Sequence, residues 1–188
     1  MACRLVNIAG LTLVEMVVTL AILAVLGLVA VPSLVAFHRS AALMSAASQV
    51  SAALSTARTQ AMARTLPTRV EPFKNGDWST GWIVYVDQNL NGSYDLGSDL
   101  LLLSQQTPLP DFLTTKKTGA DGFVFNASGF AMSSMGFSNA SLVIRRNDTA
   151  AGAETLAQTR KVVVSNTGRI RVCTPRTASD ANCDIAGL

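Results

Sequence analysis

The stretch from Val17 to Phe37 contains no charged residue, and it constrains the chain more than any other feature. About 20 such residues are enough for a helix to cross the hydrocarbon core of a bilayer. The rest of the chain has Gly, Asn, Asp and Ser at regular intervals, which is typical of a water-exposed domain. The sequence therefore predicts one membrane-spanning helix followed by a single domain outside the bilayer.

A carboxylate, Glu15, stands at the start of this helix, where a charge is costly and calls for a partner. The alternative is a Glu at the membrane interface, stabilised by the positive end of the helix. An ordinary signal peptide is cleaved after its apolar region. Here the only junction of that kind, Gly10-Leu11-Thr12-Leu13-Val14-Glu15, comes before the apolar region.

This junction resembles the class III leader of type IV prepilins and of type II secretion pseudopilins. The resemblance implies that a prepilin peptidase cleaves between Gly10 and Leu11 and that Leu11 is then N-methylated, although most members have Phe there. It also implies that Glu15 neutralises the amine at Leu11 of a neighbouring subunit. Pro32 lies where helices of this family are kinked, and proline removes a backbone donor and clashes with the preceding turn.

Beyond Pro32 the helical pattern becomes amphipathic. Apolar residues recur at spacings of three and four, at Leu43, Ala47, Val50, Leu54, Ala57 and Ala61. Such a stripe predicts a helix that packs on a sheet. Pro67 ends the helix.

The remaining residues predict short strands separated by turns such as Asn91-Gly92. The predicted strands are Thr68–Phe73, Trp82–Val86, Leu100–Ser104, Phe123–Asn126, Ser141–Arg146, Arg160–Ser165 and Arg169–Cys173. The fold class is α+β, with the long N-terminal helix packed on an antiparallel sheet, as in type IV pilins. We expect a removable leader at 1–10, a membrane or pilus-core helix at 11–37, an amphipathic helix at 38–66 and a β-rich periplasmic head at 67–188.

The order of features in the head resembles GspH/FimT-type minor pilins. The resemblance rests on Arg58 and Ala61, then Trp78, Gly81-Trp82 and Asp87-x-Asn89-x-Asn91-Gly92. It implies a single-pass protein of the bacterial inner membrane that assembles with other pilins near the tip of an extracellular pilus. We expect no enzyme and no cofactor, because His38 is the only histidine and no nucleophile–base set accompanies it.

Cys173 and Cys183 lie close together near the C-terminus and predict a disulfide, and hence an oxidising compartment. Two free thiols are the alternative. Closing so short a loop stabilises a fold by about 2–3 kcal/mol.

The segment from Asp87 to Asp95 imitates the start of an EF-hand loop, with oxygen ligands at alternate positions around Gly92. The twelfth position is Ser98 instead of a bidentate Glu, and a strand precedes the loop. We interpret it as a hairpin loop and keep calcium as the minor alternative.

The last third of the chain is rich in basic residues. In Gly168-Arg169-Ile170-Arg171 the glycine makes a turn, and the two arginines of the following strand project from one face about 7 Å apart. Two guanidinium groups so placed suit neighbouring phosphates. Further members of the predicted patch are Arg176, Arg160 and Lys161.

This motif resembles that of FimT-type pilins that bind DNA during natural transformation. It implies weak, salt-sensitive contact with the phosphates of double-stranded DNA, without base readout. The alternative is that these arginines pair with acids of the next subunit or of the Glu71–Asp99 region. The protein would then be a FimU- or GspH-like subunit that primes assembly of a type IV pilus or a type II secretion pseudopilus and binds only protein.

Overall fold

The computed structural model describes residues 12–74, 76–118, 122–133, 136–148, 153–177, 180 and 183. The predicted leader and the junction between Gly10 and Leu11 lie outside the described residues. The chain divides into two compact units, Met1–Arg39 and Ser40–Leu188. Helix α1 (Leu13–Arg64) contributes its first part to one unit and its second part to the other.

The first part of α1 is apolar and uncovered. Thr12 caps its N-terminus, since the Thr12 Oγ1 accepts a hydrogen bond from the Glu15 N–H at 3.2 Å. All described apolar side chains from Leu13 to Phe37 are exposed, Leu13 by 80%. The helix is long and apolar enough to cross a membrane. It continues without a break through Pro32, so the kink there stays a prediction.

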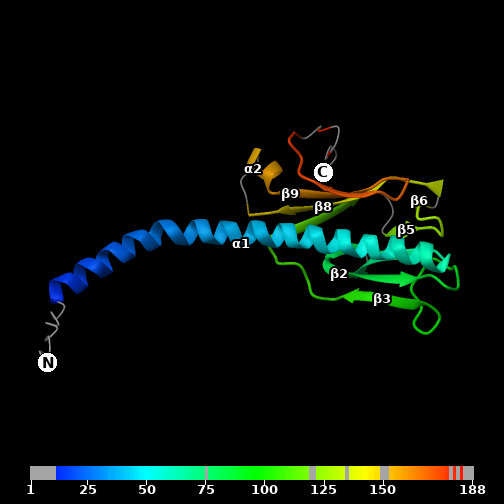
Figure 1. The fold of residues 1–188 in the computed structure, drawn as a ribbon, viewed down its shortest axis with the longest axis horizontal. Coiled ribbons are helices and arrows are strands. Elements are labelled where there is room, and N and C mark those ends of the chain that lie inside the picture. The colour runs from blue at the N-terminus through cyan, green and yellow to red at the C-terminus, as the bar shows by residue number, and fades with distance from the viewer. Residues whose placement is uncertain are drawn as a thin grey trace, which may run out of the picture. The chain divides into compact units, whose positions relative to one another are not determined.

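The second unit contains two antiparallel sheets where the sequence predicted one. The six-stranded sheet has the order β3-β2-β1-β5-β6-β7 and the four-stranded sheet the order β10-β9-β8-β4 (Figure 1). The strands of the first are β1 (Thr68–Lys74), β2 (Asp77–Val86), β3 (Leu100–Gln105), β5 (Phe123–Phe125), β6 (Ala131–Ser133) and β7 (Gly136–Phe137). Those of the second are β4 (Leu113–Thr118), β8 (Ala140–Arg146), β9 (Thr159–Val164) and β10 (Ile170–Cys173), and the short helix α2 (Ala153–Ala157) precedes β9.

The predicted strands are present, but three others were missed. Strand β4 has the sequence LTTKKT, which lacks the regular apolar positions by which a strand is recognised, and β6 and β7 are very short. Strand β2 begins at Asp77 instead of Trp82, because it pairs with β1 back to the turn between Lys74 and Asp77.

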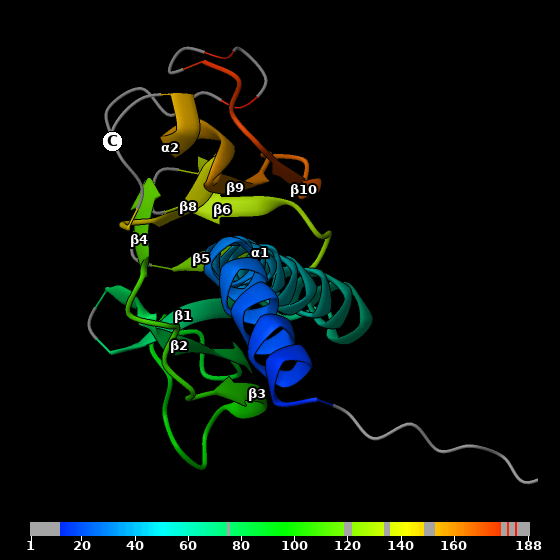
Figure 2. The ribbon, with the colours of Figure 1, turned by 90° about the vertical axis from the view of Figure 1, so that its left-hand side faces the viewer.

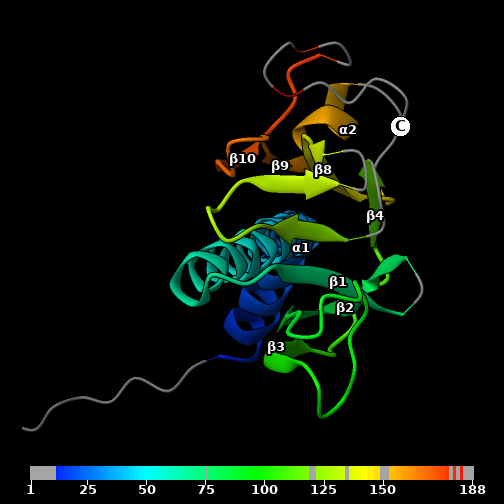
Figure 3. The same cartoon turned by 90° about the vertical axis from the view of Figure 1, so that its right-hand side faces the viewer.

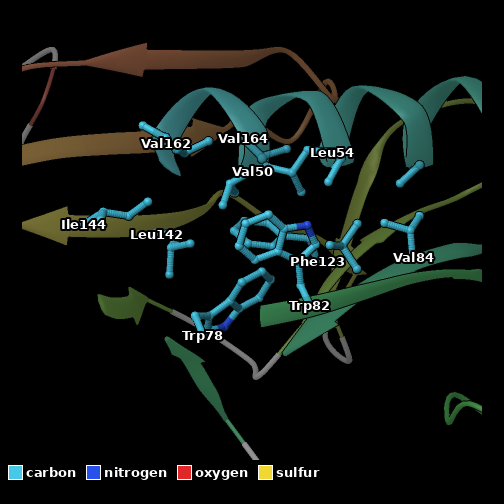
Figure 4. Packing of buried hydrophobic residues seen from close by; sticks show 14 of the residues in the cluster. Val50, Leu54, Trp78, Trp82, Val84, Phe123, Leu142, Ile144, Val162 and Val164 are labelled. Carbon is cyan, nitrogen blue, oxygen red and sulfur yellow. The ribbon is translucent and has the colours of Figure 1, made fainter. Parts of the chain in front are cut away.

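The part of α1 that belongs to the second unit lies between the two sheets (Figures 2 and 3). The predicted stripe is buried in full, with Leu43, Ala47, Leu54, Ala57 and Ala61 at 0% exposure and Val50 at 1%. Its small side chains let the backbone approach both sheets closely. Val50 and Leu54 pack with Trp82 of β2 and Val164 of β9 in one core (Figure 4). Burying a Val or Leu side chain in this way stabilises a fold by roughly 1.5–3 kcal/mol.

A polar network ties this part of α1 to the end of the four-stranded sheet. The buried guanidinium group of Arg146 donates through Nε and Nη2 to the carboxylate of Asp148 at 2.9 and 2.8 Å. Its Nη1 donates to Ser40 Oγ and to Gln158 Oε1, both at 3.2 Å. The network satisfies a buried charge that would otherwise be costly.

Candidate functional site: the β9–β10 turn and the basic strand

The Asn166-Thr167-Gly168 turn joins β9 to the edge strand β10. The Gly168 N–H donates to the Ser165 carbonyl at 2.8 Å, and the Ser165 N–H donates to the Arg169 carbonyl at 3.0 Å. Gly168 has φ +75°, a conformation that L side chains rarely adopt. The predicted role of Gly168 as a turn residue is therefore confirmed.

The side chain of Arg58 on α1 donates hydrogen bonds to this turn and to the turn that contains Gly129. Its Nε donates to the carbonyl of Gly129 at 3.0 Å, and its Nη2 donates to the carbonyl of Thr167 at 3.3 Å. Gly129 and Gly168 approach so closely that a Cβ added at Gly168 would lie 1.8 Å from the Gly129 carbonyl oxygen. The sequence singled out Arg58 only as part of a family resemblance, because nothing local indicates which carbonyls a helical arginine will reach.

Arg169 and Arg171 are both exposed, while Ile170 between them packs against the core. Strand β10 begins at Ile170, so Arg169 lies at the junction of turn and strand. Among the described residues, neither guanidinium group has a hydrogen-bond or ion-pair partner. Two positive groups are thus presented to solvent beside a rigid turn.

Lys161 and Arg160 cannot both extend this pair, because neighbouring residues of a strand face opposite sides. Lys161 pairs with Cys173, and Val163 pairs with Arg171, so Lys161 shares the face of Arg171. Arg160 pairs with the buried Ile144 and faces the other way. Its Nη1 donates to the carbonyls of Ala157 and Thr159 at 2.7 and 2.8 Å, and burial lowers its pKa. The placement of Arg160 in the patch is therefore wrong, and its guanidinium group instead satisfies backbone at the end of α2.

The predicted disulfide between Cys173 and Cys183 is present, with a Cα–Cα distance of 6.0 Å. It fastens the chain after β10 to the outward face of that strand, since Cys173 lies two residues beyond Arg171. Arg176 is exposed in this segment, and its N–H donates to Asp180 Oδ2 at 3.2 Å.

The loop after β2 uses its oxygen atoms for its own hydrogen bonds. Asp87 Oδ2 accepts from the Gly92 N–H, and Asp95 Oδ2 accepts from the side-chain amides of Asn89 and Asn91. In the described part of the chain no three His, Cys, Asp or Glu residues converge on one point. The arrangement agrees with the predicted hairpin loop, since β2 and β3 on either side of it are paired antiparallel.

Trp78 and Trp82 are each only 2% exposed. Trp78 meets Phe123 edge to face with ring centroids 5.4 Å apart. These rings therefore pack in the core and do not offer a stacking platform for bases.

The chain is similar to solved structures of minor pilins and pseudopilins. The crystal structure of the type IV minor pilin FimU of Pseudomonas aeruginosa aligns with a TM-score of 0.53 at 20% identity, over 70% of this chain and 87% of that one. A second crystal form of FimU gives 0.52 at 22% identity, over 69% and 91%. The minor pseudopilin EpsH of the Vibrio cholerae type 2 secretion system gives 0.47 at 13% identity, over 70% and 95%. No curated protein sequence matches the chain.

The two FimU likenesses show the fold, a long N-terminal helix with antiparallel sheets as in type IV pilins. The family is shown by the sequence itself, since the family model described as type II transport protein GspH matches residues 46–168. That range covers most of the second part of α1, the six-stranded sheet, strands β4, β8 and β9, and the glycine of the β9–β10 turn, and it ends before β10. The chain therefore belongs to the GspH family of minor pilins and pseudopilins.

Proposed function

We propose that this minor pilin captures DNA at the surface of a type IV pilus, in the manner of FimT-type pilins in natural transformation. The observation that carries the proposal is the exposure of Arg169 and Arg171 beside the β9–β10 turn. Hydrogen bonds from Arg58 and within the turn fix its backbone. The two arginines that follow are therefore attached to a rigid segment. Rigid placement reduces the entropy lost on binding.

The ligand is the phosphate backbone of double-stranded DNA. Each planar guanidinium group can donate two parallel hydrogen bonds to one phosphate. With few contacts per subunit we expect micromolar or weaker affinity that falls steeply with salt, and no base readout. Arg176 and Lys161 add positive charge near the pair.

The N-terminal part of the chain directs the protein into the membrane and then into the pilus. A prepilin peptidase cleaves between Gly10 and Leu11, Leu11 is N-methylated, and Glu15 neutralises that amine of a neighbouring subunit. Before assembly the apolar part of α1 crosses the inner membrane with the head in the periplasm. The exposed apolar side chains of this part support the proposal, because either lipid or the helices of other pilins must cover them.

DNA binding is tested with the full-length processed protein in an uncharged detergent. Its affinity for a fluorescent duplex is measured by anisotropy over a salt series, next to Arg169→Ala/Arg171→Ala. The control is Arg64→Ala/Lys74→Ala, which removes the same charge from exposed positions on α1 and β1. We expect the Arg169/Arg171 variant to bind much more weakly, with a slope of log affinity against log salt about 2 smaller, and the control to bind as the wild type does.

Equal binding by all three proteins would remove Arg169 and Arg171 from the site. Absence of binding even at low salt would leave the assembly role alone, as in a FimU- or GspH-like subunit whose partners are other pilins. Copurification of the other minor pilins with the Arg169/Arg171 variant then separates the two roles, since assembly does not require these arginines if they serve DNA.

A further inference from the structure

The outward face of the four-stranded sheet carries basic side chains from every strand. We propose that Arg171, Lys161, Arg145 and Lys116, here called the basic track, bind the DNA backbone together, so that bound DNA crosses all four strands and does not touch only the edge strand. This inference rests on the proposed DNA binding and adds Arg145 and Lys116 to its site.

The composition of the four strands is the first observation. Strands β4, β8, β9 and β10 read LTTKKT, ASLVIRR, TRKVVV and IRVC and contain no acidic residue. Their basic residues are Lys116, Lys117, Arg145, Arg146, Arg160, Lys161 and Arg171. A sheet of one sign of charge raises the local concentration of a polyanion and favours its binding.

The pairing register sorts these residues onto two faces. Residues paired across antiparallel strands share a face. Lys116 pairs with Val143, and Val143 with Lys161, and these lie on the face of Arg171. Arg145 is two residues from Val143 and shares this face as well. The core residues Leu142, Ile144, Val162 and Val164 occupy the opposite face, which α1 covers (Figure 2).

The three basic residues of the inner face have structural contacts. The Nζ of Lys117 lies 4.7 Å from the centre of the Phe123 ring. Arg146 is ion-paired with Asp148, and Arg160 donates to backbone carbonyls. The inner three are thus engaged within the head. On the outer face Arg171, Arg145 and Lys116 are exposed and Lys161 is half-buried.

The outer four run diagonally from Arg171 to Arg145 and then turn back to Lys116, which is level with Lys161 because both pair with Val143. Arg171 and Lys161 are diagonal neighbours on adjacent strands, as are Lys161 and Arg145, and then Arg145 and Lys116. Diagonal neighbours lie about 7–8 Å apart. Three strand spacings of about 4.8 Å carry the track across roughly 14 Å, about four base-pair steps of duplex. A hollow of about 230 Å³, lined by Lys116, Arg145, Thr114, Thr115 and Val143, has room for a phosphate group.

The track is tested with the full-length processed protein in uncharged detergent and a duplex of about 30 base pairs, over salt from about 50 to 200 mM. Lys116→Ala/Arg145→Ala is compared with the wild type and with the control Arg64→Ala/Lys74→Ala. We expect a lower affinity at every salt concentration and a salt slope reduced by about 2, from two lost phosphate contacts. The control keeps the wild-type slope.

A second readout does not depend on substitution. Lysines of the wild-type protein are acetylated with and without duplex, and the modification is measured by mass spectrometry. We expect duplex to protect Lys116 and Lys161 but not Lys74, which lies on the other sheet.

The outcomes separate the two proposals. If the wild type binds and Arg169→Ala/Arg171→Ala does not, while Lys116→Ala/Arg145→Ala keeps the wild-type slope and duplex leaves Lys116 unprotected, the track is overturned and the edge site stands. If the wild type does not bind duplex at low salt, both proposals fall.

Discussion

Arg58 of helix α1 donates its Nε hydrogen to the carbonyl oxygen of Gly129, at 3.0 Å. Both groups lie next to Gly168, in the turn that leads into Arg169. The same guanidinium group reaches the Thr167 carbonyl, so one helical residue joins the β5–β6 turn to the β9–β10 turn. These turns belong to different sheets. The exposed arginines are therefore positioned by a residue that is distant from them in sequence.

Replacing Arg58 should weaken the connection between the β5–β6 turn and the β9–β10 turn. Arg58→Met loses two hydrogen bonds from a charged donor, and we expect the free energy of unfolding to fall by about 1.5–3 kcal/mol. Urea unfolding followed by tryptophan fluorescence measures it, since both tryptophans are buried in the head. Arg64 is an exposed residue of the same helix whose Nε donates to Gln60. Arg64→Met should change stability by less than about 0.5 kcal/mol. Equal effects of the two substitutions would contradict a positioning role for Arg58.

Gly168→Ala should cost more than its backbone conformation alone explains. The added Cβ would meet the Gly129 carbonyl oxygen at 1.8 Å and Arg58 Nε at 2.8 Å. The matched control is Gly97→Ala, since Gly97 also has a positive φ, of +90°, but has nothing within 4 Å of the added Cβ. We expect a loss of about 1 kcal/mol at Gly97 and roughly 2–4 kcal/mol at Gly168, by the same unfolding measurement. Similar losses for Gly97→Ala and Gly168→Ala would mean that the turns at Gly129 and Gly168 can move apart with little loss of stability.

Removing the disulfide should destabilise the head. Cys173→Ser/Cys183→Ser frees a short loop in the unfolded chain, and we expect the free energy of unfolding to fall by about 2–3 kcal/mol. A thiol reductant should lower the stability of the wild type by a similar amount and leave the double variant unchanged. If the wild type were insensitive to reductant under conditions that open the bond, the bond would not contribute to stability.

The stability of the head should decrease at high pH because of Tyr85. Burial, together with the nearby carboxylate of Glu71, raises the pKa of Tyr85 above its ordinary value of 10.0. The unfolded chain therefore ionises this tyrosine at a lower pH than the folded chain does. The stability it contributes is complete below pH 10.0 and is lost as pH rises above that value.

The test compares urea unfolding of the wild type and Tyr85→Phe near neutral pH and above the ordinary tyrosine pKa. At neutral pH we expect the two to agree within about 1 kcal/mol. Above that pKa the variant should lose less stability than the wild type. Parallel losses in both proteins would show that other groups cause the decrease.

Several features of this protein follow from residues that are neighbours in the sequence. The apolar spacing from Leu43 to Ala61 is a property of the helix alone, and all six predicted positions are buried. The turn at Gly168 follows from a residue that tolerates positive φ, and the pairing of Cys173 with Cys183 from two cysteines close together. The strands with regular apolar positions were placed to within a few residues for the same reason.

Other features depend on contacts between distant segments. Strand β4 has little apolar pattern of its own and exists because β8 pairs with all of it. The division into two sheets arises because α1 buries its stripe against both, which no local pattern encodes. Arg58 illustrates the same limit, since its partners come from two turns far along the chain.

The placement of Arg160 and Lys161 depends partly on the sequence alone and partly on the tertiary structure. The sequence by itself determined that Arg160 and Lys161 face opposite sides of a strand, because side chains of a strand alternate. Only the tertiary structure decided which of them faces outward, since that depends on the pairing of β9 with β8 and β10 and on the side from which α1 covers the sheet. Alternation is set by local backbone geometry, whereas the choice of face is set by the burial of Val162 and Val164, which follow these charges on the same strand.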